Sequence, residues 1–172
     1  MEQKTQLGVR VYAIAKQYGI EYTMVHTIIT EYIEYCKAEL LSGRVVDFVG
    51  LVSIIPDTIL SDYKSTMAYE CSFVAKDLSL PQHTVYVVIR AYLDDLLDDI
   101  SKCKTASIRG IVNIHPIQKD GKLTNIHSAI SSSFKDNILK DSAITSVRVH
   151  TSKLLKQKLC LGSLEERWGN NV

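Results

Sequence analysis

Apolar residues recur at spacings of three and four in two stretches of the chain. The first set is Met24, Val25, Ile28, Ile29, Tyr32, Ile33 and Cys36, and the second is Val85, Val88, Ile89, Tyr92, Leu93, Leu96 and Leu97. Each set predicts a long helix with one buried face. A shorter helix precedes each, across a turn at Tyr18-Gly19 or Leu78-Ser79, and a β-rich run with a central glycine follows each.

The two patterned stretches are copies of one another. Residues 13–56 align without a gap on residues 73–116, so that FVGLVSIIP (48–56) falls on IRGIVNIHP (108–116). The identical pairs are Ala15/Ala75, Lys16/Lys76, Val25/Val85, Ile29/Ile89, Tyr32/Tyr92, Gly50/Gly110, Val52/Val112, Ile54/Ile114 and Pro56/Pro116. The shared register predicts an internal duplication of a helix-helix-strand unit. Such a unit cannot bury its apolar faces alone, so we expect the two units to pack together.

The chain continues beyond the second copy. Asp120-Gly121 is a candidate hairpin turn, and Ile144, Val147 and Val149 predict a further strand before a basic helix, KLLKQKL. We therefore expect an α+β fold with helices packed on short antiparallel sheets. The predicted divisions are a first unit over 1–60, a second unit over 61–160 with a longer arm and a C-terminal helix, and a tail over 161–172.

The unit carries three short motifs, AIA at 13–15, LLSG at 40–43 and VDFVGLVSI at 46–54, and the second unit keeps Gly110 and Ile114 but has Cys103 in place of the first glycine. With these motifs in this order, the unit resembles the HU/IHF family of bacterial DNA-bending proteins. The resemblance covers 13–56 of the first unit and 73–116 of the second, and makes Gly43, Gly50 and Gly110 the fold-defining positions. Because family members are intertwined dimers, the resemblance implies a fused dimer in one chain.

The chain departs from that family where the family touches DNA. The family's Phe-Gly after the central glycine is replaced by Leu51-Val52 and Ile111-Val112. Family members bend DNA with two basic arms that end in a proline wedge, whereas the first unit has no room for an arm and residues 117–143 contain no proline. Phe134 is a conceivable wedge, but we interpret it as a packed core residue. The DNA-bending apparatus is therefore interpreted as largely lost.

Charge is balanced overall but uneven along the chain. The net charge is +1, and residues 117–172 carry nine Lys and Arg against five Asp and Glu. Cations at suitable positions suffice for sequence-independent phosphate contacts. The candidate DNA- or phosphate-contacting residues are Lys119, Lys122, Lys135, Lys140, Arg148, Lys153, Lys156 and Lys158, and an ordinary solvated surface is the competing interpretation.

The second long helix has an acidic face. Asp94, Asp95, Asp98 and Asp99 stand there at helical spacing, and Trp168 lies in the tail outside any periodic pattern. A cation site is the weakest interpretation of the four carboxylates. We take Asp94, Asp95, Asp98, Asp99 and Trp168 as candidates for docking a partner protein, with a solvated helix face as the alternative.

No motif in the chain indicates catalysis. The five histidines lack metal-ligand spacing, and no phosphate-binding loop, nucleophile elbow or zinc-protease motif occurs. We expect a non-enzyme without cofactor, metal or small-molecule substrate. Four separated cysteines, no secretory pattern and no membrane-span-length apolar run predict a soluble protein of a reducing cytoplasm.

Two functions remain from different classes. HU/IHF-like proteins are associated with rings in the head-to-tail connector of crAss-like phages, so the resemblance implies a virion component assembled in the bacterial host cytoplasm. Its partners would be other protein subunits, as a homo-oligomer or ring. The alternative is an architectural protein of the cytoplasm or nucleoid that binds double-stranded DNA weakly and without sequence specificity. Near-neutral charge, the missing arm and wedge, and the Trp-bearing tail favour the first.

Overall fold

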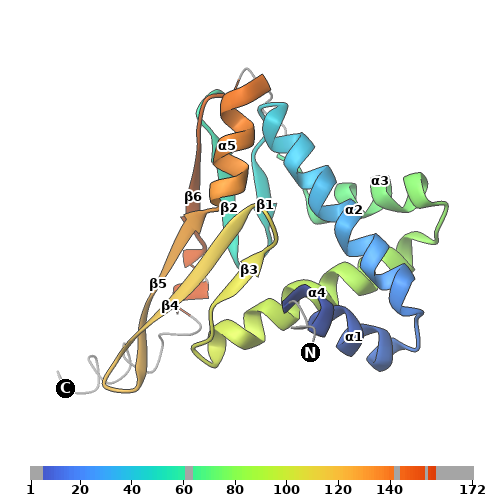
Figure 1. Cartoon of the computed structure of the whole chain (residues 1–172), viewed down its shortest axis with the longest axis horizontal. Helices are drawn as coiled ribbons and strands as arrows, with labels where there is room; N and C mark the ends of the chain where they lie inside the picture. Colours follow the sequence, from blue (N-terminus) through green and yellow to red (C-terminus); the bar gives the residue numbers. More distant parts are fainter. Residues whose placement is uncertain (1–5, 61–63, 142–143, 154, 158–172) are drawn as a thin grey trace.

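The computed structural model describes residues 6–60, 64–141, 144–153 and 155–157. The helices are α1 (Gln6–Tyr18), α2 (Tyr22–Leu41), α3 (Met67–Leu78), α4 (Gln82–Ser101) and α5 (Ser132–Asp141). The strands are β1 (Val46–Phe48), β2 (Val52–Pro56), β3 (Ala106–Ile108), β4 (Val112–Lys119), β5 (Lys122–Ile130) and β6 (Val147–Thr151). Helices α1 to α4 form one side of the molecule and the sheets the other (Figure 1), which confirms the expected α+β fold.

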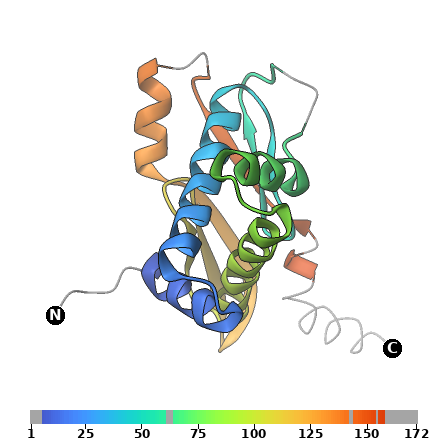
Figure 2. The same ribbon diagram turned by 90° about the vertical axis from the view of Figure 1, so that its right-hand side faces the viewer.

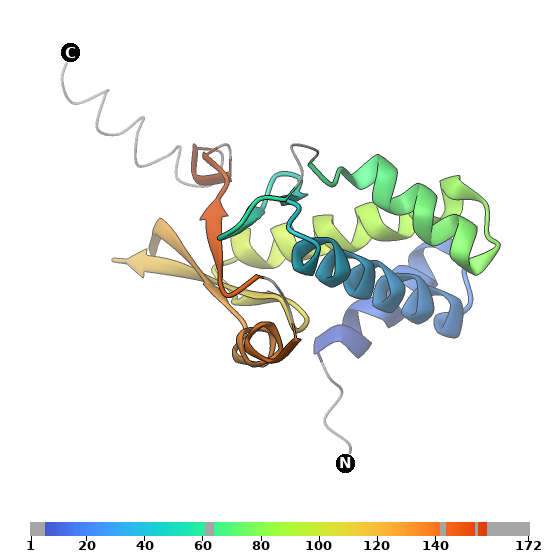
Figure 3. The same cartoon turned by 90° about the horizontal axis from the view of Figure 1, so that it is seen from above.

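The internal duplication is confirmed. In the register that aligns Gly50 with Gly110, the bounds of α2 coincide with those of α4, and the bounds of β1 coincide with those of β3. Seen from above, the two pairs of helices lie against one another (Figure 3), with α2 packed on α4, α2 on α3 and α1 on α4. The apolar faces of α2 and α4 are buried in a single core cluster that draws on both units, as expected for units that cannot bury these faces alone.

The central glycine of each unit lies in a turn between two strands. Leu51 N donates to Phe48 O at 2.9 Å, and Gly50 has φ +80°. The second unit repeats this turn around Gly110, with φ +74°. A left-handed residue in the third position of such a turn favours glycine. The expected single strand with a central glycine is therefore wrong, because each is a short antiparallel hairpin.

Gly43 occupies the turn after α2, where both the backbone conformation and the space available favour glycine. Its φ is +81°, and a Cβ there would lie 2.7 Å from Cγ of Leu60. The equivalent Cys103 has the same left-handed backbone, with φ +61°. The second unit therefore keeps this turn although it departs from the glycine motif.

Strand β6 belongs to the sheet of the first unit. The sheet orders are β1-β2-β6 and β3-β4-β5. Ile54 of β2 pairs with Val149 of β6, as Ile114 of β4 pairs with Ser128 of β5. The predicted divisions of the chain after residue 60 and after residue 160 stay a prediction. Strand β6 falls within the range 61–160 that was assigned to the second unit, but it hydrogen-bonds to the first unit.

The equivalence of β5 and β6 continues into the residues after each strand. Ser131 N donates to Ile111 O at 2.8 Å, and Ser152 N donates to Leu51 O at 2.9 Å. Phe134 and Leu155, at matching positions after these serines, are both 1% exposed, so Phe134 is confirmed as a packed residue. A second repeat thus relates β5 and α5 to β6 and the helical turn after it.

The first unit is therefore built from two separate segments. Asp57 N donates to Ser146 O at 2.9 Å, and the Asp57 carboxylate accepts hydrogen bonds from Thr145. Beyond Asp57 the chain still contacts the first unit, since Leu60 N donates to Gly43 O at 3.0 Å and Ser65 N donates to Val45 O at 2.9 Å. It then enters the second unit and returns to the first at Thr145, so the second unit is inserted between strands β2 and β6. Figure 2 shows β6 beside the hairpin of the first unit, on the side away from α1.

Candidate functional site

The β4–β5 hairpin forms one projecting arm (Figure 1). Strand β4 pairs with β5 along its whole length, as far as Lys119 opposite Lys122. Strand β3 pairs with β4 only up to Ile114, so the rest of the β4–β5 hairpin has two strands. Asp120 and Gly121 form the tip, with φ +54° and +76°. These angles confirm the expected hairpin turn, because two successive left-handed residues make the type I′ turn that suits strand twist.

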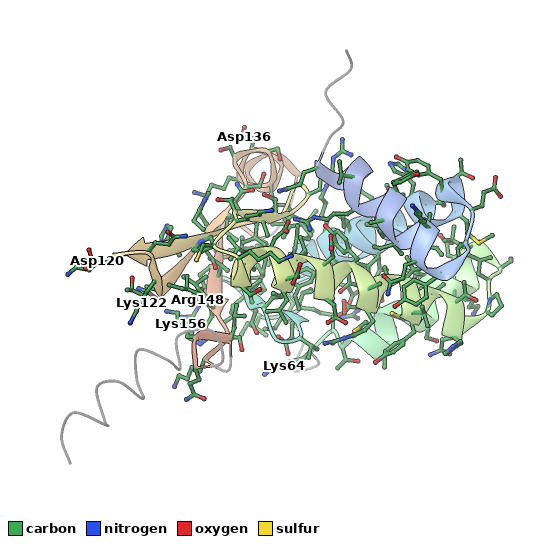
Figure 4. All side chains as sticks on the ribbon, turned by 90° about the horizontal axis from the view of Figure 1, so that it is seen from below. Lys64, Asp120, Lys122, Asp136, Arg148 and Lys156 are labelled. Atoms are coloured by element: carbon green, nitrogen blue, oxygen red, sulfur yellow. The ribbon has the colours of Figure 1, made fainter. Side chains whose placement is uncertain are left out.

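Three of the expected basic residues lie on one side of the sheets. Figure 4 shows Lys122, Arg148 and Lys156 on the side opposite Asp136. They are spread along that side, because β5 contacts β6 only where Ser128 Oγ and Thr151 Oγ1 lie 2.9 Å apart, whereas Lys122 is at the tip of the arm and Arg148 is toward the start of β6 (Figure 1). We call these three residues the basic group. Lys119 and Lys153 are exposed on the same elements.

The other candidate cations lie elsewhere. Lys135 is exposed on α5, next to Asp136. Figure 4 places Asp136 on the opposite side of the sheets from the basic group. Lys140 is also on α5, with its side chain outside the described part. Lys158 and Trp168 lie outside the described residues.

The acidic face of α4 is paired within the chain. Asp95 and Asp99 each accept a hydrogen bond from Arg10 at 2.6 Å, so that α1 is tied to α4. Asp98 pairs with Lys102 at 2.8 Å and Asp94 with Arg90 at 2.9 Å. Each carboxylate proposed for partner docking thus has an intramolecular cation, which reduces the negative charge available to a basic partner.

Sequence reasoning missed Arg10. Its side chain is only 5% exposed, although it lies among the buried Leu7, Val11 and Ile14 of α1. The sequence held one signal for it, a single arginine within the apolar face of the first helix. Because a buried arginine needs anionic partners, this position predicts a pairing with carboxylates elsewhere in the chain.

Two hollows occupy equivalent positions in the two units. One, of about 170 Å³, lies where the β1–β2 turn meets α4 and is lined mainly by Val49, Leu51, Leu93, Leu97 and Leu155. The other, of about 450 Å³, lies where the β3–β4 turn meets α2 and includes Arg109, Lys37 and Glu34. Lys37 and Glu34 pair at 3.1 Å. His26 and Thr30 also line the second hollow, but Thr30 Oγ1 donates to the backbone oxygen of His26 at 2.7 Å. The hydroxyl is therefore not paired with the imidazole as an activated nucleophile would be. The described residues contain no group of three metal-ligating side chains placed to hold an ion.

The sequence matches no protein-family model, no curated protein and no solved structure. The likeness to HU/IHF proteins therefore stays an interpretation based on motifs and repeat architecture. Among the described helices, none is long and apolar enough to cross a membrane.

Proposed function

We propose that this protein is a non-enzymatic assembly component that uses an HU/IHF-like pseudo-dimer as a protein-interaction module. The observation that supports this most strongly is the single arm. At the place where the first unit would extend its own arm, the chain instead runs into the second unit. A fold that retains both halves of its scaffold but, over the residues that the structure describes, only one arm is better suited to packing against subunits than to clasping a duplex.

The composition of the arm supports the same proposal. A proline wedge prises base steps apart in proteins that bend DNA, whereas none of the three prolines of this chain lies at the tip of the arm. Pro116 is in β4, paired with Ile126, and Pro56 and Pro81 lie outside the arm. The tip instead carries Asp120 and Gly121 between Lys119 and Lys122, without an apolar side chain that could enter a base step. By the resemblance, the assembly would be a ring in a phage head-to-tail connector, with other protein subunits as partners.

A second candidate function rests on the basic group. Lys122, Arg148 and Lys156 present three cations along one side of the sheets, from the tip of the arm to β6. Cations spread along one side of a protein contact phosphates without sequence specificity. An architectural double-stranded DNA-binding role is therefore the alternative.

Native mass spectrometry and salt-dependent gel shifts with duplex DNA separate these functions. For the assembly role we expect discrete closed oligomers and no DNA complex at physiological salt. Tight DNA binding that weakens steeply with salt would contradict it and support the alternative. In that case the triple variant K122A/R148A/K156A would lower the log–log salt slope by about 2–3. The matched control is K16A/K76A/K104A, which removes three exposed lysines that do not belong to the basic group.

A further inference from the structure

Glu70 is a carboxyl group buried where α3 of the second unit packs on α2 of the first. The residue is 0% exposed, and Sγ of Cys36 donates to its Oε2 at 3.3 Å. Its Oε1 has no hydrogen-bond partner within the described part of the chain. A buried carboxylate without a cation is costly, so this environment favours the neutral acid.

The duplication provides a direct comparison for Glu70. In the register that aligns the two units, it corresponds to Arg10 on α1. Arg10 faces Asp95 and Asp99 of α4, whose equivalents on α2 are Tyr35 and Glu39. The two equivalent contacts between the units therefore differ in chemistry, because one is an ion pair and the other holds a lone carboxyl group.

The charged and titratable groups around Glu70 come from three elements. Tyr32, Cys36 and Glu39 face it from α2, Asp47 acts on it from β1, and Cys71 is its neighbour on α3. The nearby cation Arg44 is hydrogen-bonded to both oxygens of Glu39, at 2.8 and 2.9 Å. Within the described part of the chain, no cation is therefore paired with Glu70 itself.

Burial is the main cause that raises the pKa of Glu70 from 4.5 to about 8, and the charges of Glu39 and Asp47 act in the same direction. The polar side chains of Cys36 and Ser65 oppose the rise in this pKa. Because the folded state holds the proton more tightly than the unfolded state, the contribution to stability is complete below about pH 4.5 and is lost as the pH rises to about 8. Burial also raises the pKa of the Cys36 and Cys71 thiols, which keeps both protonated over this range.

We propose that Glu70 makes the α2–α3 contact a proton-dependent joint between the two units. With the neutral acid, α3 stays docked on α2. Loss of the proton in mildly alkaline solution weakens this contact, while the α1–α4 contact formed by Arg10 is unaffected. One side of the pseudo-dimer can thus loosen while the other stays fixed.

Hydrogen exchange of the full-length protein tests this joint, with each amide corrected for its intrinsic rate. Between about pH 6.5 and 9 we expect the protection factors of α3 to fall at least tenfold, since each pH unit below the folded-state pKa changes the opening equilibrium about tenfold. The amides of α1 are the internal control and should keep their protection. A parallel fall in both helices would overturn the proposal.

Two further measurements make the result independent of any single variant. In wild-type protein, the carbon-13 signal of the Glu70 carboxyl should report the protonated form at neutral pH, and an ionised carboxylate there would overturn the proposal. Glu70→Gln should abolish the pH dependence of α3 protection. The control Glu34→Gln, at an exposed position of α2, should retain the pH dependence of α3 protection. If α3 protection in Glu70→Gln still depended on pH, the proposal would also be overturned.

Discussion

A chain that ends after Asp141 should fail to fold, although both helix pairs and one complete sheet remain encoded. This truncation removes β6, which forms an edge of the sheet of the first unit and pairs with all five residues of β2. It also removes Ile144 and Leu155, which are 0% and 1% exposed. Loss of one large buried aliphatic side chain costs about 2–5 kcal/mol, so losing both with a strand approaches the whole stability of a small domain, about 5–15 kcal/mol.

Circular dichroism and thermal unfolding of the truncated chain measure this loss. A rearranged pair is the matched control, in which residues 1–60, including Leu60 against Gly43, are joined by a short linker to residues 144–172 and co-expressed with residues 61–143. Because Asp57 and Ser146 are already hydrogen-bonded, the junction needs little distance, and we expect a folded heterodimer. A truncated chain as stable as the full one would show that β6 is dispensable to the first unit.

Arg10→Ala should have the second-largest effect. It removes the guanidinium group that joins α1 to α4 and leaves the carboxylates of Asp95 and Asp99 without their cation. Breaking a buried ion pair costs about 3–5 kcal/mol, but Asp95 and Asp99 keep 38% and 25% exposure and are partly solvated. We therefore expect a loss of about 2–3 kcal/mol in the free energy of unfolding, measured by urea denaturation.

Lys102→Ala is the matched control for Arg10→Ala. It also breaks an ion pair with an α4 carboxylate, Asp98, but both side chains are more than half exposed. Exposed pairs of this kind contribute about 0.2–1 kcal/mol, so this variant should unfold near the wild-type midpoint. Equal losses in the two variants would contradict the role assigned to burial of Arg10.

The helices and the repeat were predictable from sequence because their signal is local. Apolar spacing located α2 and α4, and the match of Gly50 with Gly110 set the register of the duplication that the structure confirms. The break of each strand at its glycine was missed because alternation continues through the turn, with Phe48 and Val52 both buried.

The partners of the candidate site residues were less predictable because they are long-range. Nothing in the local pattern of β6 says that it pairs with β2, since the choice between two equivalent sheets depends on the path of the whole chain. In the same way, the acidic face of α4 resembles a free surface until Arg10, from the first helix of the chain, is placed beside it.

The inserted second unit has a consequence for synthesis on the ribosome. Chains emerge from the N-terminus, and domains generally fold as their segments appear. The first unit begins to emerge first, yet the Asp57–Thr145 contact that closes it spans 88 positions. The second unit can complete its own sheet earlier, from one continuous segment. Helices α1 and α2 can pack on α3 and α4 once Ser101 has emerged. We therefore expect the β1–β2 hairpin to wait, with the free edge of β2 exposed or chaperone-bound, until nearly the whole chain has been translated.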